Sequence, residues 1–313
     1  MKKLLGLLLI IFALFIFVGC GDENNNENGN ENGNENGNEN GNENGNENGN
    51  ENGNENEKEN EKLVVYSEFG FAPFEYVSGK EVKGVDIDIM NLVGKELNRE
   101  VVFENVLFST IIDAVSKGKL TNVGAAGLSI TEERLEKVDF SNVYYQANLY
   151  VIYNKSAEES ISKIMTDGNK GVYWSSLKTN KGIGVQSGTT ADLFLSDEIG
   201  EGGSLEGVKK TDFQTLSVAI NDIGLNIDYV IIDELPAKSL VKGKDNLACL
   251  PLYYEGGDGA EDELAYDQYA IAVTKGETEL LAAINKVLDE LLKEDENGVN
   301  GIQKLVNKHL GLE

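Results

Sequence analysis

The 313-residue sequence is short of the side chains on which most catalysis and disulfide chemistry depend. It contains two cysteines, one tryptophan and one histidine. The chain carries no Ser/His/Asp or Cys/His set, no zinc-site spacing, and no paired carboxylates in a recognisable motif. We therefore expect a protein that is not an enzyme and that holds no metal ion. The one histidine, His309, is expected on the surface of a C-terminal helix.

Basic residues are also scarce. Lys and Arg number 27 against 54 Asp and Glu, which gives a formal net charge of −27 at pH 7. Residues 21–62 contribute −11 and Lys2 and Lys3 contribute +2, which leaves −18 on residues 63–313. Nucleic acids and anionic membranes attract basic surfaces, so neither is expected as a partner of the folded part.

The N-terminus has the order of a secretory signal peptide. Lys2 and Lys3 precede an apolar run from Leu4 to Val18, and Gly19 and Cys20 end it. A membrane-spanning helix needs roughly 20 apolar residues. The run is shorter than that, so we favour a signal peptide over a transmembrane anchor.

The tetrapeptide Phe17-Val18-Gly19-Cys20 resembles the lipobox of bacterial lipoproteins, although Phe17 stands where Leu is more frequent. The resemblance implies that residues 1–19 are a lipoprotein signal peptide. Cys20 would then carry the lipid that anchors the protein on the extracytoplasmic face of the cell membrane. The other interpretations are an ordinary cleaved signal peptide and a cysteine that occurs here by chance. With Cys20 modified, Cys249 has no disulfide partner and is expected to be a small buried hydrophobe.

Residues 20–62 form the next segment, which from Asn24 to Lys62 consists almost entirely of Asn, Glu and Gly. The unit Glu-Asn-Gly-Asn repeats from Glu27 to Asn54. Low hydrophobicity and regularly spaced negative charge predict a disordered chain. A flexible linker of this length has an end-to-end distance of roughly 35 Å, so we interpret the segment as a tether.

Residues 63–313 alternate helical and strand patterns, as βαβ units with a parallel sheet do. Helices are expected over 86–97, around 111–115, from Thr131, from Ala191 and over 277–292. Strands are expected over 63–66, 101–103, 123–126, 182–185 and 228–232. The pattern predicts an α/β fold.

Four blocks of this region carry a resemblance to a known family. They are Phe71-Ala72-Pro73-Phe74-Glu75-Tyr76, Gly84-Val85-Asp86-Ile87-Asp88-Ile89, Ser129-Ile130-Thr131-Glu132-Glu133-Arg134 with Val138-Asp139-Phe140-Ser141, and Val185-Gln186-Ser187-Gly188-Thr189-Thr190. In this order they resemble the extracellular solute-binding proteins of family 3, which bind polar amino acids.

The resemblance implies the type 2 periplasmic-binding-protein fold. Two α/β lobes are joined by two crossover strands, and the ligand lies in the cleft between them. Lobe 1 would comprise residues 63–150 plus 257–313, and lobe 2 residues 151–256. Ligands of open α/β sheets generally bind beyond the ends of the strands, which agrees with a site in the cleft.

Arg134 is the first candidate for ligand binding, because the matching arginine of the family holds the carboxylate of the amino acid. A guanidinium suits this role because it stays charged and offers a planar, bidentate fork. The alternative is a surface helix residue paired with Asp139 or Glu136.

Gly188, Thr189 and Thr190 precede the helix expected from Ala191. Unpaired backbone N–H groups at a helix start can bind the same carboxylate from the other lobe. The resemblance implies that Thr190, or Thr189 if the register differs by one, adds a hydroxyl. These residues can serve as an ordinary helix cap as well.

The resemblance also implies a site for the ammonium group of the ligand. Asp233 follows the strand expected over 228–232, where the family places an acidic residue for this task. Ser129 and the backbone carbonyl of Gly127 would complete the site. The alternative role for Asp233 is an N-cap of the helix that begins at Glu234.

Glu68, Phe71 and Phe108 match the acidic and aromatic positions that line the side-chain pocket in this family. Aromatic faces stabilise a guanidinium or ammonium by cation–π interaction. Glu68 would pair with the same cation, which favours a basic amino acid. Glutamine binders also carry an acidic residue here, and both aromatic residues are equally suited to a core.

The function implied is binding of a polar, by preference basic, amino acid and its delivery to the permease of an ABC importer that has a separate ATPase. We expect a monomer without cofactor. The spacing of Gly182, Gly184 and Gly188 matches neither the dinucleotide fingerprint nor the Walker loop. The alternatives are a sensory ligand-binding module and a dehydratase-like enzyme on the same fold.

Overall fold

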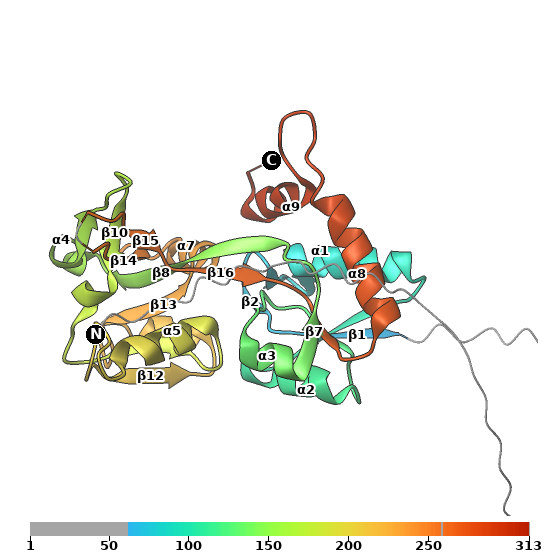
Figure 1. The fold of residues 1–313 in the computed structure, drawn as a ribbon, viewed down its shortest axis with the longest axis horizontal. Coiled ribbons are helices and arrows are strands. Elements are labelled where there is room, and N and C mark those ends of the chain that lie inside the picture. Colours follow the sequence, from blue (N-terminus) through green and yellow to red (C-terminus); the bar gives the residue numbers. More distant parts are fainter. Residues whose placement is uncertain (1–61, 258, 313) are drawn as a thin grey trace, which may run out of the picture. The chain divides into compact units, whose positions relative to one another are not determined.

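Two large β-sheets organise the protein into two lobes (Figure 1). The structure is a computed structural model that describes residues 62–257 and 259–312. The signal peptide predicted for residues 1–19, the lipidation of Cys20 and almost all of the tether lie outside the described residues. The predicted two-lobed α/β fold is confirmed, whereas the residue boundaries proposed for the two lobes stay a prediction.

Lobe 1 contains a five-stranded sheet of order β5-β1-β6-β17-β7. Strand β1 runs parallel to β5 and β6, and β17 runs antiparallel to β6 and β7. The strands are β1 (Leu63–Ser67), β5 (Val101–Asn105), β6 (Val123–Gly124), β7 (Val138–Phe140) and β17 (Ala272–Thr274). A small antiparallel sheet of β2 (Gly70–Phe71), β3 (Glu75–Ser78) and β4 (Glu81–Lys83) belongs to the same part of the chain.

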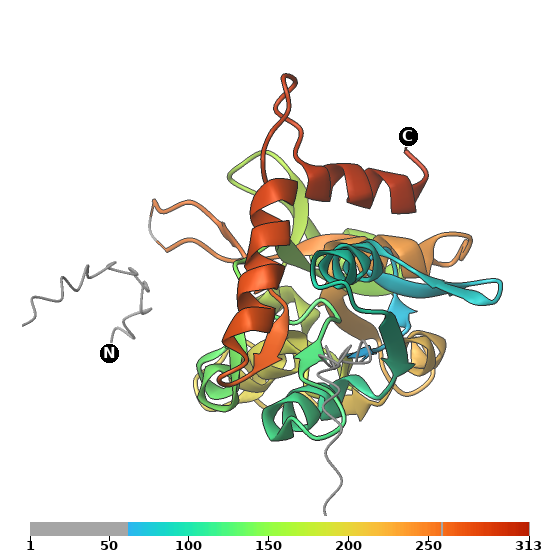
Figure 2. The same cartoon turned by 90° about the vertical axis from the view of Figure 1, so that its right-hand side faces the viewer.

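Helices cover both faces of the lobe 1 sheet. They are α1 (Val85–Glu96), η1 (Phe108–Thr110), α2 (Ile111–Lys117), α3 (Glu132–Lys137), α8 (Thr278–Leu291) and α9 (Gly301–Leu310). Neighbouring residues of a strand point to opposite faces, so Val273 packs with α1 and α8 while Ala272 packs with α2. Helix α8 crosses the side of lobe 1 that faces the viewer in Figure 2.

Lobe 2 contains a nine-stranded sheet of order β12-β11-β13-β8-β14-β10-β9, to which β15 and β16 add at β14 and β8. Its strands are β8 (Tyr145–Asn154), β9 (Ser162–Ile164), β10 (Lys170–Tyr173), β11 (Ile183–Gln186), β12 (Lys210–Phe213), β13 (Tyr229–Asp233), β14 (Leu247–Tyr254), β15 (Glu263–Leu264) and β16 (Tyr266–Tyr269). Its helices are η2 (Lys155–Ala157), α4 (Glu158–Ile161), η3 (Trp174–Leu177), α5 (Thr190–Ile199), α6 (Leu216–Asp222) and α7 (Glu234–Val241).

Strands β8 and β16 form the antiparallel pair that connects the lobes (Figure 1). The pairing sets Asp267 opposite Ala147 and Tyr269 opposite Tyr145. Every second residue of β16 is buried, so Asp267 and Tyr269 face inward. Polar and aromatic side chains of the connection therefore reach the region where the lobes meet.

Most of the elements expected from local patterns are present, although the structure has many more strands. The helices expected over 86–97 and 277–292 appear within a residue or two at each end, and Thr131 caps α3 as expected. The strand expected over 123–126 is shorter, since only Val123 and Gly124 pair. Within the described ranges, the helices are all too short or too polar to cross a lipid bilayer.

Two expectations for single residues were wrong. The side chain of His309 is only 5% exposed, because α9 packs against α1 and brings the imidazole onto Asp88 and Tyr76. Cys249, expected to be buried, is only partly buried on β14, and burial raises the pKa of its thiol to about 11.

Candidate functional site

Arg134 lies where the two lobes meet. It is the third residue of α3, whose start is fixed by a hydrogen bond from the Arg134 backbone N–H to the Thr131 hydroxyl. The buried guanidinium donates from Nη1 to the carbonyl oxygen of Ser129 at 2.6 Å and from Nη2 to the carbonyl oxygen of Gly188 at 2.8 Å. One cation thus joins the third and fourth sequence blocks.

The positive charge of Arg134 interacts with nearby groups without forming an ion pair in the part of the chain that the structure describes. Burial lowers the pKa of the guanidinium, and the negative charge of Asp267 acts in the opposite direction. The ring of Phe108 lies 5.6 Å from the guanidinium carbon, within cation–π range. Among the described residues Arg134 forms no direct ion pair with a carboxylate, and an arginine stays protonated in proteins. A buried cation is therefore present that an anionic ligand group can approach.

The two threonines of the fourth block have different partners. The Thr189 hydroxyl caps α5, since it accepts from the Asp192 N–H and donates to the Gln186 carbonyl. The Thr190 hydroxyl instead faces lobe 1, 3.2 Å from the hydroxyl of Ser129. The geometry favours Thr190 for a ligand contact and Thr189 for the cap.

The backbone N–H of Gly188 is paired, whereas the sequence had led us to expect an unpaired one. It donates to Oδ2 of Asp192 at 3.0 Å and is therefore already occupied. The φ angle of Gly188 is +78°, a conformation that glycine adopts without strain. This conformation accompanies a Gly188 carbonyl oxygen that accepts from Arg134.

Asp233 is buried at the end of β13 and at the start of α7. Asp233 occupies the N-cap position, but its side chain makes no capping hydrogen bond. Its Oδ1 atom accepts no hydrogen bond from any residue that the structure describes. Burial raises the pKa of the carboxyl well above its usual range, and the charge of Asp267 raises it further. The Tyr269 hydroxyl lies beside it and acts in the opposite direction. A buried acid with one unsatisfied oxygen suits a cationic group.

Glu68 follows β1 and is also buried. Burial raises the pKa of its carboxyl, and an interaction with the side-chain amide of Gln186 lowers it. Gln186 lies on β11 of lobe 2. Glu68 is thus a second carboxyl at the meeting of the lobes.

The two phenylalanines predicted for one pocket occupy different clusters. Phe71 is buried against Phe74 and Tyr269, with ring centroids 6.0 and 6.2 Å away. Phe108 is partly buried and packs beside α2 and against Arg134. Phe71 also touches Gly127, because a Cβ added to Gly127 would lie 2.8 Å from the Phe71 ring. Phe71 is thus buried among aromatic rings and Phe108 lies beside the cation, and a role in the side-chain pocket stays a prediction for both.

The buried side chain of Asp86 positions Gly127. Asp86 lies in the second sequence block, where the sequence analysis gave it no role. Its N–H donates to Oδ2 of Asp86 at 2.9 Å, and the Tyr144 hydroxyl donates to Oδ1 at 2.6 Å. Burial raises the Asp86 pKa to about 6, against these two hydrogen bonds. Glu75 is fully buried nearby, and its pKa is raised well above the usual range by burial and by the charges of Asp86 and Glu68.

Asp267 is the site residue that sequence reasoning missed. Its carboxylate accepts a hydrogen bond from Thr190, and the hydroxyl of Ser129 is also within its reach. The available signal was the alternation in Tyr266-Asp267-Gln268-Tyr269, which on a strand turns Asp267 to the same side as Tyr269. No local motif marks the residue.

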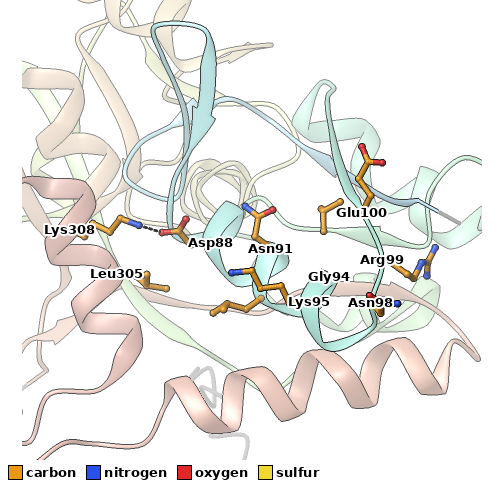
Figure 3. A pocket seen from close by; sticks show the side chains of 11 residues that line it. Asp88, Asn91, Gly94, Lys95, Asn98, Arg99, Glu100, Leu305 and Lys308 are labelled. Atoms are coloured by element: carbon orange, nitrogen blue, oxygen red, sulfur yellow. Dashed lines mark hydrogen bonds and ion pairs between the residues drawn. The ribbon is translucent and has the colours of Figure 1, made fainter. Parts of the chain in front are cut away.

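A surface pocket of about 840 Å³ lies elsewhere on lobe 1 (Figure 3). Residues of α1 and α9 contribute to its wall, and Lys308 pairs there with Asp88 at 2.7 Å. The pocket contains none of the residues predicted to bind a ligand. Of those residues, Ser129 bonds both Arg134 and Thr190 where the lobes meet. The described residues also provide no group of three or more His, Cys, Asp or Glu side chains able to hold a metal ion.

The fold and the buried groups between the lobes define a two-lobed binding protein. Residues 63–311 match the model of the bacterial extracellular solute-binding proteins, family 3. The match covers most of the chain, and the protein belongs to this family.

Relatives and solved structures agree with this assignment. An arginine-binding extracellular protein of Bacillus subtilis is 28% identical over 251 residues, which cover 79% of this chain and 85% of the relative. A substrate-binding protein of an amino-acid ABC transporter from Streptococcus pneumoniae, solved with L-arginine, has a TM-score of 0.65 at 27% identity, covering 80% and 95% of the two chains. An ancestral arginine-binding protein, solved with arginine and with glutamine, has a TM-score of 0.64 at 30% identity, covering 80% and 98%.

Proposed function

We propose that this protein captures a basic amino acid, arginine before others, between its two lobes and delivers it to the permease of an ABC importer. The observation that carries the proposal is the position of Arg134. Its buried guanidinium contacts one backbone carbonyl from each lobe and forms no direct ion pair within the described part of the chain. A ligand carboxylate bound there would be held by charge-assisted hydrogen bonds.

The balance of charge around Arg134 supports a cationic ligand. Glu68, Asp233 and Asp267 are all buried, so the meeting of the lobes holds three carboxyls against one guanidinium. Burying a carboxylate without a counter-ion is costly. A basic amino acid brings one net positive charge, whereas glutamine brings none. Relatives that are named for arginine, or solved with it, point the same way.

We also propose how the protein is located in the cell. A signal peptide over residues 1–19 would export the chain, and a lipid on Cys20 would anchor it on the extracytoplasmic face of the cell membrane. The segment 20–62 would tether the folded part, which would act as a monomer. Labelling with a radioactive fatty acid tests the anchor, since Cys20→Ala should abolish incorporation.

Binding would favour a closed arrangement of the lobes, because Arg134 and Ser129 belong to one lobe and Thr190 and Asp233 to the other. A ligand shifts such an equilibrium only by the difference between its affinities for the two states, and several charge-assisted bonds supply a difference of this kind. A permease with its own ATPase would read the closed form. We propose no catalytic activity for the chain itself.

A thermal-shift panel with the twenty amino acids tests the proposal. A ligand that binds only the folded state raises the melting temperature, and at a fixed concentration the rise grows with the logarithm of its affinity. Arginine should give the largest rise, with lysine and histidine next and acidic amino acids without effect. A panel in which no amino acid raises the melting temperature would refute the proposed function. Turnover of any of them would support the dehydratase-like alternative.

A further inference from the structure

Asp267 lies on β16, one of the two strands that connect the lobes. From this strand its carboxylate reaches one hydroxyl of each lobe. It accepts a hydrogen bond from Thr190 of α5, and Ser129 of lobe 1 lies 3.2 Å from the same threonine hydroxyl. The side chain is 7% exposed, so the carboxylate is held between the lobes and not at their rim.

Strand register brings Asp267 toward Asp233. Asp233 on β13 pairs with Leu149 of β8, and Asp267 on β16 pairs with Ala147 of the same strand. Residues two apart on a strand share one face of the sheet, so both aspartates lie on the same face. The negative charge of Asp267 raises the pKa of Asp233, which agrees with two carboxyls in one buried environment.

The protein itself supplies too few positive charges for this pair. Among the described residues no Lys or Arg forms an ion pair with either aspartate, and the terminal nitrogens of Arg134 donate to backbone carbonyls. Hydroxyls from Thr190 and Ser129 satisfy oxygens of Asp267, and Oδ1 of Asp233 has no partner in normal geometry. Hydroxyl groups stabilise a buried carboxylate but leave its charge in place.

We propose that Asp267 is a second carboxylate of the ammonium site, so that Asp233 and Asp267 together hold the α-amino group of the ligand. This inference rests on the proposed function and assigns one more residue to its site. An ammonium group has three N–H donors and no acceptor, which suits two carboxylates and one further oxygen. The carboxylate of the same ligand would lie against Arg134, which adjoins Asp267 through Ser129.

The competing explanation is that Asp267 only fastens the lobes to each other through Thr190 and Ser129. The two roles differ in which ligands they affect. A fastening residue acts on the closed state, and its loss weakens every ligand by the same factor. An ammonium-binding residue acts only on ligands that carry the α-amino group.

The test is a calorimetric titration of the wild-type protein and Asp267→Asn with arginine and with 5-guanidinopentanoic acid, which is arginine without its α-amino group. The weaker ligand is measured by displacement of arginine. Asp267→Asn should weaken arginine roughly 10- to 100-fold and leave the deaminated ligand within about twofold of the wild type, as expected for a bond to a charged group. The ratio of the two affinities does not depend on the fraction of protein that is folded.

Controls make the outcome decisive. Asp212→Asn removes the same charge from an exposed position on strand β12 and should change neither affinity. Asp267→Ser provides a second, smaller neutral variant if Asp267→Asn folds poorly. Equal loss for both ligands, or no loss for either, overturns the role of Asp267 and leaves the proposed function in place. A wild-type protein that binds neither ligand overturns both.

Discussion

The guanidinium of Arg134 donates a 2.8 Å hydrogen bond to the carbonyl oxygen of Gly188, which lies 54 positions later in the chain. Arg134 is the third residue of α3 in lobe 1, and Gly188 precedes α5 of lobe 2. The bond therefore connects the two lobes directly, at the residue on which the proposed ligand site depends. Changes close to this contact should alter binding, and changes deeper in each lobe should alter stability.

Gly127 should tolerate alanine poorly for a reason beyond backbone conformation. Its φ angle is +54°, and an added Cβ would lie 2.8 Å from the ring of Phe71. A left-handed conformation alone costs an alanine about 1–2 kcal/mol, and displacing Phe71 adds to that. Urea unfolding should show a loss of roughly 2–4 kcal/mol for Gly127→Ala.

Gly79→Ala is the matched control for Gly127→Ala. Gly79 has a similar φ of +68° but nothing within 4 Å of an added Cβ, so only the backbone cost remains. Equal losses for the two variants would mean that the contact with Phe71 has no energetic weight.

Asp86 should make stability depend on pH. Burial raises its pKa from 3.8 to about 6, so the folded state binds the proton more tightly than the unfolded state does. The stabilisation from the protonated Asp86 carboxyl is complete below about pH 4 and is lost as the pH rises through 6. The free energy of unfolding falls by about 3 kcal/mol over this range. The free energy of unfolding of Asp86→Asn, relative to the wild type, should therefore improve between pH 4 and pH 7.

Tyr144→Phe provides the complementary measurement for Asp86. The Tyr144 hydroxyl lowers the Asp86 pKa by donating to the carboxylate, so its removal should move the loss of stability to higher pH. A difference between Asp86→Asn and the wild type that stays constant from pH 4 to 7 would contradict the assignment.

Ligand binding should release a proton through Asp233. Burial raises the pKa of this carboxyl well above its usual range, and an ammonium group beside it would lower that pKa. Between the lowered and the raised pKa, binding therefore expels a proton. Calorimetry in two buffers with different ionisation enthalpies measures the number released, which should approach one and disappear in Asp233→Asn. Identical binding enthalpies in both buffers would oppose this role.

Glu68 should determine the preference for a basic side chain. It is buried near Gln186, and Glu68→Gln keeps its shape but removes its charge. We expect arginine affinity to fall about tenfold, with glutamine affinity unchanged or higher. Glu81→Gln, at an exposed position on strand β4, serves as control and should affect neither ligand. Parallel losses for arginine and glutamine would show that Glu68 does not discriminate between side chains.

The α/β class and part of the candidate site could be predicted from local signals, whereas the two-lobed fold was implied by the family resemblance. The block from Ser129 to Arg134 contains its own helix cap, and that cap fixes where the guanidinium leaves the helix. Thr190 follows a cap in the same way. Periodicity within each segment was enough to place α1 and α8.

The remaining features depend on contacts between distant segments. Asp267 reaches the site only because β16 pairs with β8, and no motif near residue 267 reports that pairing. His309 is buried only because α9 packs on α1. The packing of Phe71 against Phe74 and Tyr269 could not be predicted from its own block, because Tyr269 lies far along the chain.

Titration of arginine into the wild-type protein, Arg134→Lys and Arg99→Lys tests the central claim most directly. Lysine keeps the positive charge but loses the bidentate fork. Arg99 is the other arginine of the described residues and donates to the Lys62 carbonyl, away from the site. We predict that Arg134→Lys weakens arginine binding roughly 10- to 100-fold, while Arg99→Lys leaves it unchanged. Equal affinity in all three proteins, or equal loss in both variants, would contradict the account.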